Sequence, residues 1–175
     1  MHCKKINMKP TRLWLFKLLT FLLPETRCYA FKASVLRWCG ATVGQNVRIV
    51  SGVEIVGNGK LSIGDDVFIG AGSRIVAVAP AEVIIGSHID IAPQVLMLTG
   101  THFVEPEGSH MAGRGEARSV KIGDGCWLCA RTTILPGISL VEKTVVAAGS
   151  VVTQDVGESK ALIAGAPAKK VKSYA

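Results

Sequence analysis

Histidine is the side chain best suited to accept and return a proton near neutral pH, and this chain has four histidines. His2 lies in a basic N-terminal tail, and His88 falls on a corner within a run of six-residue steps. His102 stands in LTGTHFVEP, where that six-residue rhythm stops for about two dozen residues, and His110 lies inside the same interruption. A histidine in a loop is most often a surface residue, so the surrounding motif has to identify a general base among the four.

Five cysteines, at positions 3, 28, 39, 126 and 129, show no spacing typical of a disulfide framework. Their odd number favours a reducing compartment, and we expect a cytoplasmic protein. Cys126-x-x-Cys129 has the spacing of half a zinc site or of a redox pair, but no second pair accompanies it. Both residues also fit the six-residue steps, so we interpret them as packing residues and expect no metal.

The six-residue steps run from residue 41 to residue 157, apart from the interruption over 98–121. Fifteen aliphatic residues mark them: Val43, Ile49, Ile55, Ile63, Ile69, Ile75, Ile85, Ile91, Met97, Ile122, Leu128, Ile134, Leu140, Val146 and Val152. A second column of mostly small or β-branched residues stands two positions before each of these. A 3.6-residue helical period cannot produce this spacing. Each step therefore predicts a short strand with two inward side chains and a corner, with three strands to a coil and five coils in all.

Four further stretches accompany the repeat: TGTH, IGDGCWLCARTTILPG, AAGSVVTQDV and AGAPAKKVK. With the repeat they resemble the hexapeptide-repeat acyltransferases, above all the maltose, galactoside and capsular-polysaccharide O-acetyltransferases, over most of residues 41–172. The resemblance implies an all-β fold, a left-handed parallel β-helix of about five coils. Its handedness comes from the resemblance alone, since general crossover rules favour the right hand. We expect a helical segment over 1–40, the β-helix over 41–157 with a protruding loop at 98–121, and a C-terminal extension over 158–175.

The resemblance also implies the chemistry, which is the transfer of an acetyl group from acetyl-CoA to a sugar hydroxyl of a polysaccharide, O-antigen or capsule precursor. His102 matches the family's catalytic histidine through TGTH, so it is expected to be the general base. Glu105 and Glu107 are near enough in sequence to orient its imidazole. Acetyl-CoA is expected in a crevice between two prisms of a homotrimer, with no metal required.

Seven residues match positions of the family's donor site. Backbone groups at Ala130 and Ala148 are expected along the pantetheine arm with Trp127 nearby, and the nucleotide end is expected at Thr153, Gln154, Lys169 and Lys172. Gln154 stands where the family usually has lysine, and Gly72 stands where sugar-acetylating relatives have an asparagine that holds the acceptor. The acceptor pocket therefore differs from theirs, and the sequence does not identify the sugar.

Three other functions compete with sugar O-acetylation. N-acetylation of an amino sugar would use the same fold and donor. A γ-class carbonic anhydrase needs three histidines that converge on a metal, whereas His88, His102 and His110 lie 14 and 8 positions apart, on corners that do not match. A scaffold without activity would have no reason to combine the TGTH loop with the C-terminal AGAPAKKVK.

The basic character of the chain belongs to residues 1–40, which carry eight basic side chains against one acidic side chain, Glu25. Residues 41–175 carry twelve of each, which argues against a nucleic-acid-binding surface on the β-helix. The apolar run 12–23 is too short to span a bilayer, and no signal-peptide cleavage site follows it. Two amphipathic helices are expected, over 12–23 and 28–40. They either dock on an anionic membrane that presents a lipid-linked sugar or cap the first coil, and the two interpretations are compatible.

Overall fold

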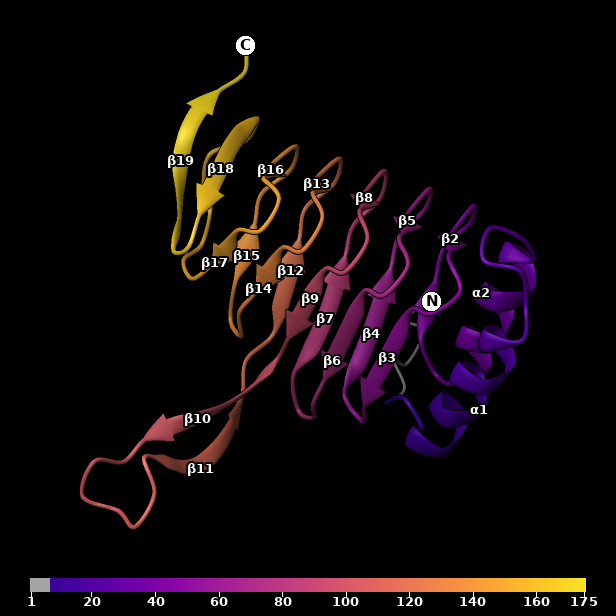
Figure 1. The fold of residues 1–175 in the computed structure, drawn as a ribbon, viewed down its shortest axis with the longest axis horizontal. Coiled ribbons are helices and arrows are strands. Elements are labelled where there is room, and N and C mark those ends of the chain that lie inside the picture. The colour runs from indigo at the N-terminus through magenta and orange to yellow at the C-terminus, as the bar shows by residue number, and fades with distance from the viewer. Residues whose placement is uncertain (1–6) are drawn as a thin grey trace, which may run out of the picture.

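The computed structural model describes residues 7–175, so the expectations for His2 and Cys3 concern residues outside the described part of the chain. Two helices, α1 (Pro10–Phe21) and α2 (Tyr29–Trp38), come first and are followed by short strands that wind into a prism (Figure 1). The strands stack in parallel into three sheets. The prism is the parallel β-helix that the six-residue period predicts, with the left hand that the family resemblance implies.

Each coil contributes one strand to each sheet in turn. Sheet A contains β1 (Thr42–Val43), β4 (Lys60–Ile63), β7 (Glu82–Ile85), β12 (Val120–Ile122) and β15 (Ser139–Leu140). Sheet B contains β2 (Arg48–Ile49), β5 (Phe68–Ile69), β8 (Asp90–Ile91), β13 (Trp127–Leu128), β16 (Val145–Val146), β18 (Ala161–Gly165) and β19 (Ala168–Ser173). Sheet C contains β3 (Glu54–Gly57), β6 (Arg74–Ala77), β9 (Leu96–Leu98), β14 (Thr133–Ile134) and β17 (Val151–Val152).

Five coils are complete, and a sixth is partial. Val156 bridges to Leu140 beside sheet A, and β18 then pairs in parallel with β16. Strand β19 turns back antiparallel to β18 at the end of the prism. The segment expected to be an extension, 158–175, therefore begins by continuing sheet B, and Ile163 of β18 is buried in the core.

The core consists of the two residue columns that the six-residue period marks, and all thirty of these residues are buried. Their side chains fill the interior because every second residue of a strand points inward. Two threonines of the second column, which stands two positions before the aliphatic one, hydrogen-bond to the backbone. Thr132 Oγ1 donates to the carbonyl of Cys129 at 2.7 Å, and Thr144 Oγ1 donates to that of Val141 at 2.9 Å. The aliphatic columns thus hold the coils together by burial, without unpaired polar groups at these threonines.

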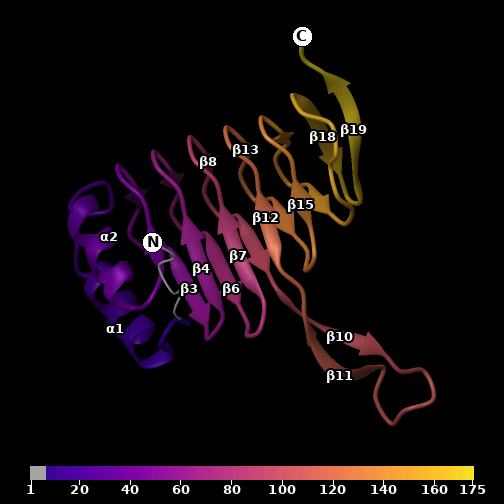
Figure 2. The ribbon, with the colours of Figure 1, turned by 180° about the vertical axis from the view of Figure 1, so that it is seen from behind.

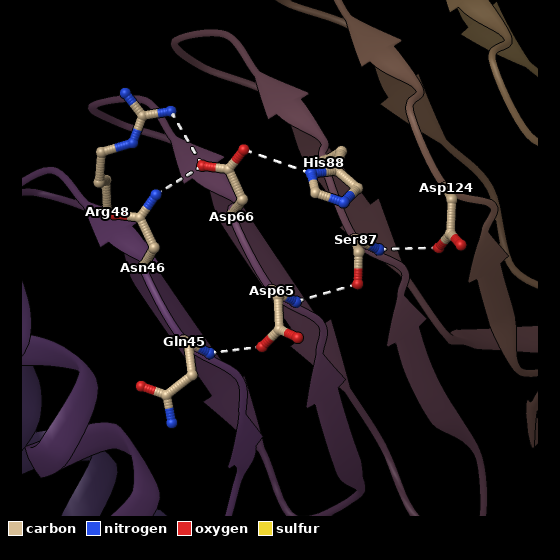
Figure 3. A network of polar contacts seen from close by, with 8 residues as sticks. All are labelled: Gln45, Asn46, Arg48, Asp65, Asp66, Ser87, His88 and Asp124. Carbon is tan, nitrogen blue, oxygen red and sulfur yellow. Dashed lines mark hydrogen bonds and ion pairs between the residues drawn. The ribbon is translucent and has the colours of Figure 1, made fainter.

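A ladder of polar contacts runs along the corner between sheets A and B and fixes the register of successive coils (Figure 3). The amide of Gln45 donates to Asp65 Oδ1 at 2.6 Å, and the amide of Asp65 donates to Ser87 Oγ at 3.0 Å. His88 lies on this corner, as expected, with a left-handed φ of 58° and with Nδ1 3.3 Å from Asp66 Oδ2. Its side chain therefore belongs to the ladder.

The two helices close the open first coil. Leu13 and Phe16 of α1 and Leu36 of α2 are buried and join the same core as the strands. Lys32 is fully buried, and its Nζ donates to the carbonyls of Pro24 and Glu25 at 3.1 and 2.9 Å, which fixes the turn between the helices. The interpretation of this segment as a cap is confirmed. Within residues 7–175, neither helix has the length and hydropathy needed to cross a bilayer.

Candidate active site

Residues 98–121 leave sheet C after β9 and rejoin the prism at β12 of sheet A. The sequence predicts a protruding loop here, and the structure adds that much of it is an antiparallel hairpin of β10 (Gly100–Val104) and β11 (Ala112–Ala117). Both views show it projecting away from the prism (Figures 1 and 2). At its root, the amide of Arg118 donates to the carbonyl of Thr99 at 2.8 Å.

His102 lies on β10 of this hairpin, directly opposite Gly115 of β11, and its side chain is exposed. Its Nδ1 is 2.8 Å from the carbonyl oxygen of Gly113. A carbonyl oxygen only accepts hydrogen bonds, so Nδ1 carries the proton in this contact. In the neutral imidazole the lone pair is then on Nε2, the arrangement that a general base requires.

Neither Glu105 nor Glu107, the two acidic residues expected to orient this imidazole, contacts it. Glu105 instead accepts a hydrogen bond from the amide of Arg114 at its Oε1, 3.2 Å away, and Glu107 is an exposed residue of the turn. The Glu105 carboxyl lies so close to Gly113 that a Cβ there would be 2.0 Å from its Cδ. Glycine at 113 thus lets the strand that orients His102 lie against Glu105. Sequence reasoning missed this partner, because a backbone carbonyl leaves no signature in side-chain types.

The residues expected along the pantetheine arm lie on sheet B and at its corner with sheet C. Trp127 is on β13 and is 53% exposed. Ala130 and Ala148 follow β13 and β16 and lie on adjacent coils, where the amide of Gly149 donates to the carbonyl of Ala130 at 2.9 Å. Their small side chains leave the backbone of this corner open to close approach by a ligand.

The residues expected at the nucleotide end lie near the last coil. Gln154 and Lys169 line one pocket of about 370 Å³, and Thr153 directly precedes Gln154 at the exposed end of β17. Lys170 forms an ion pair with Glu158 beside the same pocket, whereas Lys169 has no ion pair within residues 7–175. The Lys172 ammonium lies 4.6 Å from the centre of the Tyr174 ring.

A single prism does not bring the histidine and the pantetheine residues together. The hairpin emerges at the corner between sheets C and A, whereas Trp127 lies on sheet B, the face opposite that corner. Ala130 and Ala148 lie at the corner between sheets B and C. The histidine and the expected pantetheine residues therefore lie on different faces of one prism.

Neither the histidines nor the cysteines form a metal site in the part of the chain that the structure describes, where no group of three or more His, Cys, Asp or Glu residues could hold a metal ion. Cys126 is buried in the second column of the repeat, and its Sγ donates to the carbonyl of Val141 at 3.1 Å. Burial raises the pKa of both the Cys126 and Cys129 thiols, which disfavours the reactive thiolate form. Both residues behave as packing residues.

The repeat matches the family model described as the hexapeptide repeat of succinyl-transferase, over residues 60–87 and 119–154. A relative in Escherichia coli strain K12, the putative colanic acid biosynthesis acetyltransferase WcaF, is 30% identical over 137 residues, which are 78% of this chain and 72% of that protein. The galactoside O-acetyltransferase of the same strain is 28% identical over 143 residues, which are 81% of this chain and 68% of that enzyme.

Two solved structures show the same fold. A hexapeptide-repeat acetyltransferase from Vibrio cholerae, complexed with acetyl-CoA, superposes with a TM-score of 0.62 at 23% identity and covers 94% of this chain and 86% of its own. A mutant of AntD, an N-acyltransferase from Bacillus cereus, in complex with dTDP and coenzyme A, has a TM-score of 0.64 at 17% identity and covers 86% of this chain and 91% of its own.

Proposed function

This chain belongs to the hexapeptide-repeat acyltransferases, and on that premise we propose that it transfers an acetyl group from acetyl-CoA to a sugar hydroxyl, with His102 as the general base. The observation that carries the proposal is the hydrogen bond from His102 Nδ1 to the Gly113 carbonyl. That bond directs a basic Nε2 away from the hairpin strand that orients it. The acceptor is a precursor of a polysaccharide, an O-antigen or a capsule.

In the proposed reaction His102 Nε2 acts twice, first as a base and then as an acid. His102 Nε2 takes the proton of the acceptor hydroxyl while the hydroxyl oxygen attacks the thioester carbonyl carbon and forms a C–O bond. The tetrahedral intermediate then breaks its C–S bond, and the leaving thiolate receives the proton from the imidazolium. The products are the acetyl ester and the free thiol of coenzyme A, and the imidazole returns to its starting state.

The acetyl donor is proposed to lie between two chains of a homotrimer. Trp127, Ala130 and Ala148 would contact the pantetheine arm, while the hairpin of the neighbouring copy supplies His102. Support comes from the separation of these groups on one prism. At the nucleotide end, Thr153, Gln154, Lys169 and Lys172 are proposed to bind, and the ammonium of Lys169 is suited to a phosphate because no carboxylate pairs with it among residues 7–175.

The acceptor is proposed to be attached to a lipid, and a peripheral position at the membrane through residues 1–40 belongs to the same proposal. Gly72, where sugar-acetylating relatives carry asparagine, lies at the corner between sheets B and C and has no side chain to bind a sugar. The acceptor contacts must therefore come from other groups. A saccharide carried on a lipid would be delivered to the site from the bilayer rather than captured from solution.

Acetylation of an amino sugar is the alternative that the likeness to the N-acyltransferase AntD keeps open. That likeness extends to the fold, whereas the relatives matched over most of their sequence include an enzyme named for O-acetylation. The two outcomes differ in the stability of the product, because an ester is cleaved by alkaline hydroxylamine and an amide survives.

Acetyl-CoA turnover tests the proposal directly. The purified protein should release coenzyme A when supplied with nucleotide sugars, lipid-linked saccharides or simple glycosides, and hydroxylamine should remove the radiolabelled acetyl group from the product. A label that resists hydroxylamine would establish N-acetylation. Absence of acetyl-CoA binding would contradict the proposed function as a whole.

A further inference from the structure

The α1–α2 cap is apolar on two opposite sides. One side of α1, formed by Leu13, Phe16 and Thr20, is buried against the first coil. The opposite side is not covered. We define the cap surface by six residues whose large apolar side chains are exposed, namely Trp14 (64%), Leu18 (45%), Phe21 (77%), Leu22 (73%), Phe31 (50%) and Trp38 (47%).

This concentration is local. Eight of the fifteen large hydrophobic side chains exposed in the described residues lie within 10–38. The groove between the helices is also apolar, with a volume of about 360 Å³ and a lining that includes Leu15, Leu19 and Trp38. A concentration of exposed apolar side chains of this kind is typical of a site of contact with another molecule or with a membrane.

Basic side chains accompany the cap surface. Lys9 and Arg27 are exposed and have no ion pair among the residues described. The Arg12 guanidinium lies 4.5 Å from the centre of the Trp38 ring and donates to the Trp38 carbonyl at 2.7 Å, so a fixed positive charge adjoins the apolar groove. Glu25 is the only acidic residue of the first forty. Lys17 is ion-paired with Glu54 of β3, so the unpaired positive charge beside the cap surface rests on Lys9, Arg12 and Arg27.

The positive charge of this segment distinguishes the two candidate occupants of the cap surface, a second copy of the chain and an anionic bilayer. A second copy docked through the same surface would bring two positive segments together, with one carboxylate each to offset them, and such like-charge contacts are unfavourable. An anionic bilayer would attract the basic side chains and also bury the apolar ones. We propose that the cap surface docks on an anionic lipid bilayer.

The placement of the cap suits this geometry. It closes the end of the prism opposite β18 and β19, so prisms packed side by side leave it uncovered (Figure 1). The 12 residues of α1 extend about 18 Å, less than the roughly 30 Å thickness of a hydrocarbon core, so the helix meets the bilayer along its side. Three coils separate the cap from the hairpin root, or about 14 Å at about 4.8 Å per coil. Delivery of a lipid-linked saccharide across that height rests on the proposed function, whereas docking itself does not.

Cosedimentation with vesicles tests the docking. The full chain should sediment with phosphatidylcholine vesicles that contain phosphatidylglycerol, remain in solution with pure phosphatidylcholine, and be released at high salt. Leu18→Glu/Leu22→Glu should weaken partitioning onto anionic vesicles by about 10-fold or more, because each change removes an apolar side chain and adds a negative charge. Ser159→Glu adds a charge to an exposed residue at the other end of the prism and should bind as wild type does.

The outcomes separate lipid from other partners. The chain remaining in solution with both vesicle types would overturn the proposal, as would equal losses in the two variants. Self-association of the full chain beyond the proposed trimer, if Leu18→Glu/Leu22→Glu abolishes it, would instead identify a second copy as the occupant of the cap surface. If the double variant unfolds in a thermal melt, Leu22→Glu alone serves, since Leu22 lies just beyond the helix and is 73% exposed. Turnover on a soluble acceptor should be unchanged in every folded variant. Loss of vesicle binding would therefore test the docking proposal, and loss of turnover would test the proposed function.

Discussion

Replacing Gly113 by alanine tests whether the strand that orients His102 depends on close packing against Glu105. A Cβ on Gly113 would lie 2.0 Å from the Glu105 Cδ and 2.4 Å from its Cγ. Ordinary contact between carbon atoms begins near 3.5 Å, so the side chain or the strand has to move by about 1.5 Å. Such a movement is enough to break the 2.8 Å hydrogen bond that His102 donates to the Gly113 carbonyl.

We expect Gly113→Ala to lower kcat roughly 10-fold. A displacement of about 1 Å at a catalytic group costs up to about 10²-fold in rate, but rotation of Glu105 into solvent relieves part of the clash at the cost of one hydrogen bond, about 1 kcal/mol. Glu105→Ala loses only its bond to the Arg114 amide and should lower kcat about 2- to 5-fold. When Glu105 is replaced by alanine, the atoms that would clash with a Cβ on residue 113 are gone. Gly113→Ala should therefore cause no further loss of kcat in the Glu105→Ala background.

The assay is steady-state release of coenzyme A by the four members of this double-mutant cycle, with thermal melts to verify folding. Gly115→Ala is the matched control. Gly115 is on β11, the same strand as Gly113, and lies opposite His102 of β10, but a Cβ there would have nothing within 4 Å. Equal losses for Gly113→Ala in the two backgrounds would refute the argument from close packing. A loss in Gly115→Ala as large as in Gly113→Ala would show that the hairpin tolerates no added methyl group at all.

Three further predictions concern the shared site, the donor and the cap. Chains carrying His102→Ala and chains carrying Ala148→Trp should recover roughly a quarter of wild-type activity when they are refolded together at equal ratio. About three quarters of the trimers are then mixed, and each mixed trimer has one intact site of three. No recovery would contradict a site shared between chains. Lys169→Ala should raise the KM for acetyl-CoA roughly 5-fold at constant kcat, whereas Lys170→Ala should not, and equal effects would point to general electrostatics. The Lys17 ammonium donates a hydrogen bond to Glu54 and so holds the pKa of that carboxyl below its ordinary value. The ionised carboxylate therefore stabilises the fold when the pH is above the unfolded-state pKa of about 4.3, and this stabilisation is lost as the pH falls through the folded-state pKa. Denaturation should therefore show Glu54→Gln less stable than wild type at pH 7, with the difference shrinking as the pH falls below the unfolded-state pKa; a constant difference would contradict the linkage.

The prism could be predicted from sequence because its determinants are side chains at fixed spacing. Residues such as Ile49, Ile69 and Ile91 recur at the same point of successive coils, and no other regular structure buries them together. The partial sixth coil escaped this reasoning because β18 follows a corner that breaks the six-residue count. The hairpin escaped as well, since β10 and β11 are mostly exposed and show no hydrophobic alternation.

The two interpretations of residues 1–40 could not be separated by pattern alone. Leu13 and Phe16 face the coil while Leu18 and Leu22 face outward, so α1 has apolar residues on both sides and its sequence predicts cap and docking surface equally. Only the packing shows which side the coil occupies. One consequence is that deletion of residues 1–40 does not isolate membrane binding, because it would expose the buried core of the first coil.

The central claim is that His102 acts as the general base, and turnover by His102→Ala tests it most directly. General-base catalysis typically contributes about 10²- to 10⁴-fold, so kcat should fall by that factor while calorimetry shows nearly unchanged binding of acetyl-CoA. His110→Ala, which removes an exposed histidine from the same hairpin, should retain wild-type turnover. Turnover near wild type in a folded His102→Ala protein would contradict the claim.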